Sequence, residues 1–286
     1  MSPITNLHKG AALLGVFALC FLLELRYPLR KQTQPKLKRT LVNISIAGVS
    51  AILMRIIFYP AVLWLSEVTE LQHWGLIPRM NLPILFQTFV SLIVLDYTFY
   101  LWHQFLHKIP FLWRFHNVHH IDLDLDTSTA LRFHFGELMI STLYRSAQIF
   151  IFGINVFTLI IFETGVTAFA LFHHSNLRIP LSLERLLSYL IITPRIHGIH
   201  HSIIRNETDS NFGTILTIWD RLHRTLRLNI NQKEITIGVP SYRNPREQNF
   251  IQSLLAPFEK QRAWKLPDES IPERQLKRKE SMLLLP

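Results

Sequence analysis

Histidines are the residues of this chain whose spacing points most directly to chemistry. Twelve of the fourteen lie between positions 103 and 223, and eight of these fall into one HxxxH pair and two HxxHH triplets. The pair is His103 and His107, and the triplets are His116, His119 and His120, then His197, His200 and His201. Side chains three or four residues apart share one face of a helix, so each group predicts a patch of neighbouring imidazoles.

Gathered imidazoles point to a metal site. Neutral imidazoles are good ligands for iron, zinc or copper, whereas protonated ones repel each other. Eight histidines exceed what a single ion takes as ligands, so the three groups predict a two-metal centre. Chance would place two HxxHH triplets together in on the order of one chain in a thousand, which makes the pattern specific. The last triplet also follows a helix start, because Thr193 is a good N-cap and Pro194 is favoured at the first helical position.

Long apolar runs supply the elements that must position these histidines. Apolar residues make up 49% of the chain and the mean hydropathy is +0.20. A bilayer core needs roughly 20 helical residues, which residues 41–66 and 82–102 provide and residues 11–25 approach. Residues 138–172 predict a helical hairpin that turns at residues 153–155. The predicted fold is therefore an all-α integral membrane protein with four to five transmembrane or half-spanning helices.

The charges between these runs predict how the chain is oriented. Residues 26–39 carry six basic side chains and no acidic one, which places this loop in the cytoplasm. The span at residues 82–102 then returns to the cytoplasm and carries His103 and His107 with it. The hairpin leaves that side and comes back to it, which brings His173 and His174 to the other histidines. We therefore expect a cytoplasmic helical cap that holds the di-metal site, in a bacterial inner membrane or in the endoplasmic reticulum.

Composition also limits the partners and the domain organisation. The net charge of +10 fits the cytoplasmic bias of basic loops and attraction to membrane lipids, and no nucleic-acid-binding motif accompanies it. The single cysteine, Cys20, excludes an intrachain disulfide and a cysteine-based zinc site. We divide the chain into N-terminal membrane helices (1–80), a histidine-rich catalytic domain (81–240) and a peripheral tail (241–286).

Three further polar residues are candidates for supporting the ligands. Asp96 precedes His103 by seven residues, on the same helical face and within an apolar span, where an ionisable group is costly. It either accepts an N–H from a ligand imidazole or bonds to a Tyr or Thr of the bundle. Asn176 is a candidate for the same supporting role near the last triplet. His134 either takes part in the site or bonds to Glu137 or to lipid headgroups.

The order of the motifs resembles that of the fatty-acid hydroxylase / sterol desaturase superfamily, which carries HxxxH, then HxxHH, then a later (H/Q)xxHH. Further similarity lies in the Asp96-Tyr97 pair, in residues 172–180, and in the NFG and WDRL sequences at 211–213 and 219–222. The likeness extends from roughly residue 85 to residue 225. Two positions differ from the family pattern: Phe135 replaces a proline, and His223 follows the WDRL sequence in place of an aromatic residue.

The resemblance implies a membrane-bound oxidoreductase with a di-iron centre. It implies O2 as co-substrate, an external electron donor (a separate protein or a diffusible reductant), and hydroxylation or desaturation of a fatty acyl, sterol, carotenoid or ether lipid. It also adds a further ligand at His173 or His174, without choosing between them. The implied ligands are His103, His107, His116, His119, His120, His173, His174, His197, His200 and His201.

A metal-binding membrane protein or transporter without oxygenase activity is the alternative. Transport sites lie near the middle of the membrane on broken helices. The predicted topology places the histidines at the membrane interface instead, which favours the enzyme.

Overall fold

The structure, a computed structural model, describes residues 3–274 of the 286. This part of the chain is all-helical and contains no β-strand, only isolated bridges, as the sequence predicted. The α-helices are α1 (Pro3–Arg26), α2 (Lys36–Leu53), α3 (Tyr59–Leu71), α4 (Ile84–Lys108), α5 (Pro110–His120), α6 (Phe135–Phe152), α7 (Val156–His174), α8 (Leu181–Ser188), α9 (Pro194–His200), α10 (Arg205–Thr208), α11 (Ile218–Leu222) and α12 (Phe250–Leu255). Short 3₁₀ turns lie at Pro78–Met80, Thr127–Leu131, Gln232–Glu234, Pro245–Glu247 and Ala256–Phe258.

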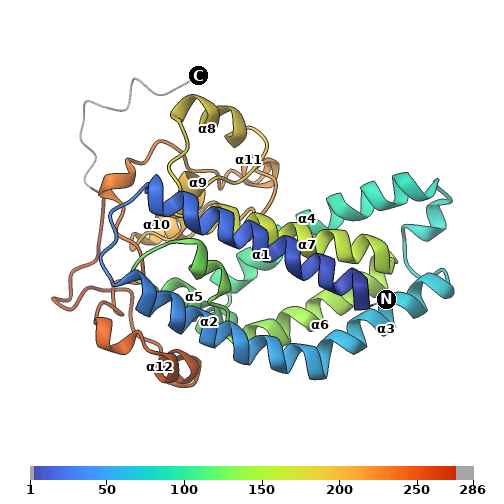
Figure 1. Cartoon of the computed structure of the whole chain (residues 1–286), viewed down its shortest axis with the longest axis horizontal. Helices are drawn as coiled ribbons and strands as arrows, with labels where there is room; N and C mark the ends of the chain where they lie inside the picture. The colour runs from blue at the N-terminus through green and yellow to red at the C-terminus, as the bar shows by residue number, and fades with distance from the viewer. Residues whose placement is uncertain (1–2, 275–286) are drawn as a thin grey trace.

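Within residues 3–274, three helices are long and apolar enough to cross a membrane: the continuous helix Lys36–Leu71, α4 and α7. They contain the predicted span 41–66, the predicted span 82–102 except for its first two residues, and the second arm of the predicted hairpin. α1 and α6 lie beside them, and the long helices together form one bundle (Figure 1). The predicted number of four to five crossing or half-crossing helices stays a prediction.

The hairpin of α6 and α7 turns where the sequence placed it. Gly153 ends α6 with φ +74°, in the left-handed region that glycine tolerates, and Asn155 caps α7 by accepting from the Thr158 N–H at 2.8 Å. A Cβ at position 153 would lie 2.3 Å from the carbonyl oxygen of Trp74, so the close approach of the neighbouring loop also requires glycine.

The helix Lys36–Leu71 contains a π-helical turn at Met54–Phe58, between α2 and α3. Pro60 follows directly, as the second residue of α3. Proline has no N–H to donate and its ring clashes with the carbonyl four residues earlier, so the backbone widens ahead of it. This turn places Met54 and Tyr59 on the wall of the internal cavity described below.

The short helices α8 to α11 and the loops around them form a cap at one end of the bundle (Figure 1). Residues after 240 pack onto the same end: α12 lies against α2, and buried Arg132 donates to Ser253 Oγ at 2.8 Å and to Gln248 Oε1 at 3.2 Å. The described part of the predicted tail is thus anchored to the helices, whereas residues 275–286 lie outside the described residues. The division into three domains stays a prediction.

A buried charge network joins the first turn of α2 to the end of α1 and to the loop after α5. Arg39 Nε lies 2.8 Å from Asp122 Oδ1, and Arg39 Nη1 lies 2.7 Å from Asp126 Oδ2. Lys36 pairs with Glu24 at 2.5 Å. Several of the basic residues that predicted a cytoplasmic loop therefore have structural partners inside the protein, and the side of the membrane on which they lie stays a proposal.

We predict that Arg39→Met destabilises the protein by about 3–5 kcal/mol, because it leaves Asp122 and Asp126 buried without their cation. The measurement is the unfolding midpoint in mild detergent, followed by near-UV circular dichroism. Lys38→Met is the matched control, since Lys38 is the exposed neighbour on the same helix. Equal midpoints for the two variants would contradict the structural role of the network.

Candidate metal centre

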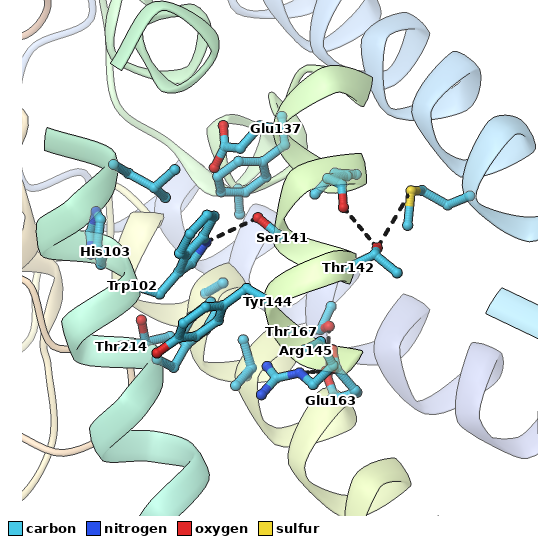
Figure 2. Close-up of a pocket in the computed structure, with 18 of the residues that line it drawn as sticks. Trp102, His103, Glu137, Ser141, Thr142, Tyr144, Arg145, Glu163, Thr167 and Thr214 are labelled. Carbon is cyan, nitrogen blue, oxygen red and sulfur yellow. Dashed lines mark hydrogen bonds and ion pairs between the residues drawn. The ribbon is translucent and has the colours of Figure 1, made fainter. Parts of the chain in front are cut away.

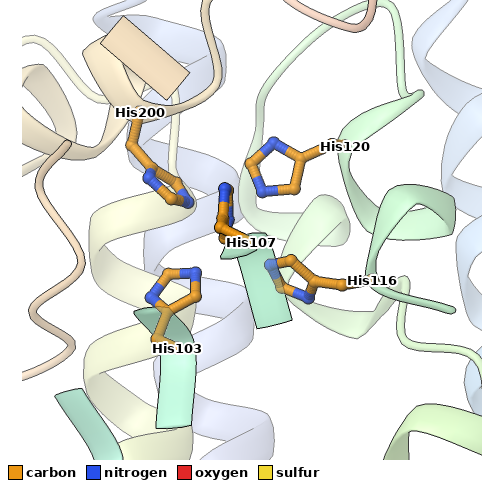
Figure 3. A group of neighbouring side chains, drawn as sticks. All are labelled: His103, His107, His116, His120 and His200. Atoms are coloured by element: carbon orange, nitrogen blue, oxygen red, sulfur yellow. The ribbon is translucent and has the colours of Figure 1, made fainter. Parts of the chain in front are cut away.

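The structure gathers nine of the ten predicted histidines into two buried clusters. In each cluster the ligand nitrogens lie within 4.8 Å of one another. The first cluster, shown in Figure 3, contains His103, His107, His116, His120 and His200. The second cluster contains His119, His174, His197 and His201.

Each HxxHH triplet is divided between the two clusters. His120 belongs to the first cluster and its neighbour His119 to the second, and His200 and His201 are separated in the same way. The three imidazoles of each triplet are neighbours, as predicted, with ring centroids 4.8–5.4 Å apart. They face two different clusters because consecutive helical residues point about 100° apart around the axis. The clusters therefore adjoin, and the rings of His120 and His201 are stacked with centroids 4.3 Å apart.

The histidines of the first cluster are oriented through their Nδ1 atoms. In four of them Nδ1 lies within hydrogen-bond distance of an oxygen. The Nδ1 atoms of His103 and His200 lie 2.8 Å from Phe212 O and 2.7 Å from Ser210 O. Those of His107 and His116 lie 3.3 Å from Asp209 Oδ1 and 2.9 Å from Glu137 Oε1. A carbonyl oxygen can only accept, so Nδ1 carries the proton and Nε2 keeps its lone pair. The Nε2 atoms of His107, His116, His120 and His200 are buried without a partner among the described residues. Buried lone pairs that converge in this way fit a metal ion.

The second cluster is tighter. His174 Nε2 lies 2.9 Å from His119 Nε2 and 2.9 Å from His197 Nε2, and His201 Nε2 lies 3.1 Å from His197 Nε2. His174 Nδ1 donates to Ala170 O at 2.8 Å, which leaves a lone pair on its Nε2. Four Nε2 atoms therefore converge, and the donor set again fits one metal ion.

Burial keeps these imidazoles neutral. It holds the pKa of His119, His120, His197, His200 and His201 well below the usual value, and neighbouring imidazoles lower the pKa of each further. The neutral imidazole is the form that binds a metal.

The structure separates the two histidines between which the sequence did not choose. His174 lies in the second cluster, whereas His173 lies outside both. His173 Nδ1 donates to Thr214 O at 3.1 Å, and its ring centroid is 4.1 Å from that of His197. His173 also lines the internal cavity, so it contacts the edge of the centre.

The supporting roles predicted for Asp96 and Asn176 are not those in the structure. Asp96 Oδ2 accepts from Trp219 Nε1 at 2.7 Å and bonds to no imidazole, because seven residues carry it about 10 Å along α4 from His103. The alternative of a Tyr or Thr partner is wrong as well. The Asn176 side chain accepts from the backbone N–H of Arg30 at 2.8 Å and donates to its carbonyl at 2.8 Å, which fixes the loop after α1.

His134 acts at the start of α6 and not as a ligand. Its Nδ1 accepts from the Gly136 N–H at 3.0 Å, and its Nε2 donates to Leu254 O at 3.1 Å. It is fully buried and both ring nitrogens have these other partners, so the expectation of a bond to lipid headgroups or to Glu137 is wrong. By capping α6 it places Glu137, which does contact a predicted ligand.

The sequence did not predict the hydrogen-bond partners that orient the histidines. Several are backbone carbonyls of residues 210–214, and a carbonyl leaves no trace in a sequence. An available signal was Asp220 of the WDRL sequence, because its carboxylate accepts from the N–H groups of Phe212 and Gly213 at 2.9 and 2.8 Å. The backbone of Asn211, the first residue of the NFG sequence, is in the left-handed conformation, with φ 54°. Asp220 thus fixes the NFG turn and with it the carbonyls that orient the histidines.

We predict that Glu137→Gln lowers the metal affinity of the first cluster by about 10–100-fold, because a neutral amide replaces the carboxylate that accepts from His116. The measurement is metal retention against increasing concentrations of a chelator. Ser141→Ala is the control on the same helix, since Ser141 bonds to Trp102 and lines the same cavity. Unchanged retention in Glu137→Gln would show that the His116 contact does not support the metal.

Comparison with known proteins supports the reading of these motifs. A family model for fatty acid hydroxylase matches residues 88–225, which include both HxxHH triplets. Over residues 88–225 the chain is thus similar to the fatty acid hydroxylase family. The resemblance drawn from the motif order is therefore confirmed.

The curated proteins that this chain resembles are lipid-modifying enzymes by name. Ornithine lipid hydroxylase OlsE of Rhizobium tropici is 29% identical over 62% of this chain and 51% of its own length. Cholesterol 25-hydroxylase of Rattus norvegicus is 26% identical over 66% of this chain and 65% of its own. Alkylglycerol monooxygenase of Caenorhabditis elegans is 25% identical over 55% and 30%. The matches thus span less than two thirds of these relatives, and no solved structure matches the chain.

Proposed function

We propose that this protein hydroxylates a lipid at a two-metal histidine centre. The observation that carries the proposal is a cavity of about 400 Å³ that joins the histidines to the membrane helices (Figure 2). His103, His116, His119, His174 and His197 line it at the centre, and side chains of α3, α4, α6 and α7 form its walls.

The cavity suits an apolar chain or ring system. Its walls include Phe99, Trp102, Leu106, Leu159 and Val166, and its volume lies within the range of small-molecule sites. A lipid bound there would be shielded from water, with one C–H bond held against the histidines. Binding, orientation and exclusion of water are the contributions that we assign to the chain itself.

We propose two irons as the resident metals, one in each cluster. Imidazole binds zinc, copper and iron alike, but zinc has no redox chemistry and the relatives are named hydroxylases and monooxygenases. When bound, the irons supply the oxidising power for C–H hydroxylation, with O2 as co-substrate and electrons from an external donor. That donor is a separate protein or a diffusible reductant.

Side-chain and backbone oxygens of the chain hold the histidine ligands in the orientation and tautomer that bind a metal. Glu137 accepts the Nδ1 proton of His116, and the carbonyls of Phe212 and Ser210 accept those of His103 and His200.

We also propose that the cap and the centre lie on the cytoplasmic side of the membrane, where a soluble electron donor has access.

The test is incorporation of labelled oxygen into lipid. Membranes from iron-supplied cells that express the protein are incubated with ¹⁸O2 and a reductant, and the lipids are analysed by mass spectrometry. We expect a lipid that gains one ¹⁸O atom and is absent with the His120→Ala/His201→Ala variant. A lipid that loses two hydrogens instead would indicate desaturation, and no change in any lipid would contradict the proposal.

A further inference from the structure

An ion pair lies in the cavity away from the histidines. Arg145 of α6 and Glu163 of α7 pair with Nε and Oε1 2.8 Å apart, and both side chains line the cavity (Figure 2). The pair links the two arms of the α6–α7 hairpin, which is a structural role. Their position on the cavity wall indicates a second role.

The pair lies deep within the bundle. Arg145 follows Glu137 by eight residues on α6, a rise of about 12 Å, and Glu163 precedes His174 by eleven residues on α7, a rise of about 16 Å. Glu163 is thus near the middle of α7, one of the helices able to cross a membrane. Ionisable side chains at such depth are costly and usually mark a functional path or site.

Arg145 is satisfied by the protein itself. It donates to Gln148 Oε1 at 2.6 Å and lies over the rings of Phe99 and Phe162, 5.6 and 4.8 Å from their centroids. It is buried, and these contacts fix its guanidinium where Glu163 meets it.

Glu163 is only partly satisfied. Its Oε1 pairs with Arg145, whereas no described side chain bonds to its Oε2, and its side chain is 39% exposed. Thr142 and Tyr59 also line the cavity and add hydroxyl groups to its wall. The cavity therefore offers a hydrogen-bond acceptor with no protein partner at a distance from the histidines.

We propose that Arg145 and Glu163 form a subsite for the hydroxyl group of a neutral lipid alcohol, with a long chain or a sterol-like body. This inference rests on the proposed function. The hydroxyl donates to Glu163, and the apolar body extends to the histidines. The reacting carbon then lies roughly 12–16 Å from the hydroxyl, the rise that separates the ion pair from the centre.

The chemistry of the subsite disfavours charged head groups. A carboxylate or phosphate beside Glu163 is repelled, and moving any unpaired charge to the depth of the pair is costly. A hydroxyl avoids both costs and still satisfies the acceptor.

The test compares ligands of equal length that differ only at one end. Binding of tritiated 1-dodecanol to the purified metal-loaded protein in nanodiscs is competed with dodecane and with dodecanoate. We expect 1-dodecanol to bind about tenfold more tightly than either competitor, the effect of one hydrogen bond to a charged group.

The test variant is Arg145→Met/Glu163→Leu. Removing both partners leaves no unpaired charge, so this variant is expected to fold, whereas Glu163→Leu alone would leave buried Arg145 without its carboxylate. It is expected to lose the preference for the alcohol while it still binds dodecane. Glu67→Gln removes an exposed carboxylate outside the cavity and is expected to keep the preference.

The outcomes separate this inference from the proposed function. An unchanged preference for the alcohol in the double variant, or no preference in the wild type, overturns the subsite even if a lipid is hydroxylated. A preference that depends on the pair supports the subsite even if no lipid is oxidised. In turnover, we expect dodecanol and hexadecanol to be oxidised at the same number of carbons from the hydroxyl. Oxidation at a constant distance from the far end of the chain contradicts the inference.

Discussion

His120→Ala and His201→Ala are each expected to remove one metal ion and to lower lipid oxidation by more than about a hundredfold. The loss should exceed the 10–100-fold typical of removing a partner of a ligand, because a ligand itself is lost. His120 belongs to the first cluster and His201 to the second, and their rings stack against each other. Each substitution therefore removes a ligand from one site and a packing contact from the other.

The measurement is metal per chain by elemental analysis, together with the amount of labelled lipid product. His223→Ala is the control, since His223 is exposed and lies outside both clusters. It is expected to keep its metal and its activity. Full metal content in both cluster variants would mean that the clusters do not bind the metals that we assign to them.

Asp220→Ala is expected to release the metals although Asp220 is not a ligand. Its buried carboxylate accepts from the N–H groups of Phe212 and Gly213 and from Thr225 Oγ1 at 2.6 Å. Alanine leaves three donors without this acceptor, at a cost of about 1–3 kcal/mol for each one that stays buried. We therefore expect a loss of roughly 3 kcal/mol or more in stability.

The same substitution should also disturb the centre. The turn that Asp220 holds presents carbonyls to the Nδ1 atoms of His103 and His200. Without these acceptors the two imidazoles are free to change tautomer or to rotate. Arg221→Ala is the control, because Arg221 is the exposed neighbour, and its side chain donates to Ser188 O and lies over the Tyr189 ring. If Asp220→Ala binds metal and unfolds like Arg221→Ala, the turn does not position the ligands.

The histidine spacing predicted most of the site because helical geometry is local. Positions three and four apart share a helix face whatever the rest of the fold, so the triplets indicated both the helices α5 and α9 and the proximity of their imidazoles. The apolar runs and the turn at Gly153 predicted the bundle for the same reason.

The remaining features depend on contacts between distant segments. The histidines of distant segments that complete each cluster are brought together by the packing of α4, α5, α7 and α9 around a common centre, which no spacing reveals. Asp96 was a candidate for supporting the ligands because of its helical face and its apolar span, yet its partner is Trp219, 123 positions away. The pairing of Arg39 with Asp122 and Asp126 likewise joins segments that local patterns do not connect.

The metal content of the intact protein tests the central claim most directly. We would purify the protein from ⁵⁷Fe-supplied cells in mild detergent and combine elemental analysis with Mössbauer and optical spectra. The account predicts two irons per chain, one for each histidine cluster, and no haem band. A single zinc, or no metal in iron-supplied preparations, would contradict the two-iron centre and favour a metal-binding membrane protein without oxygenase activity.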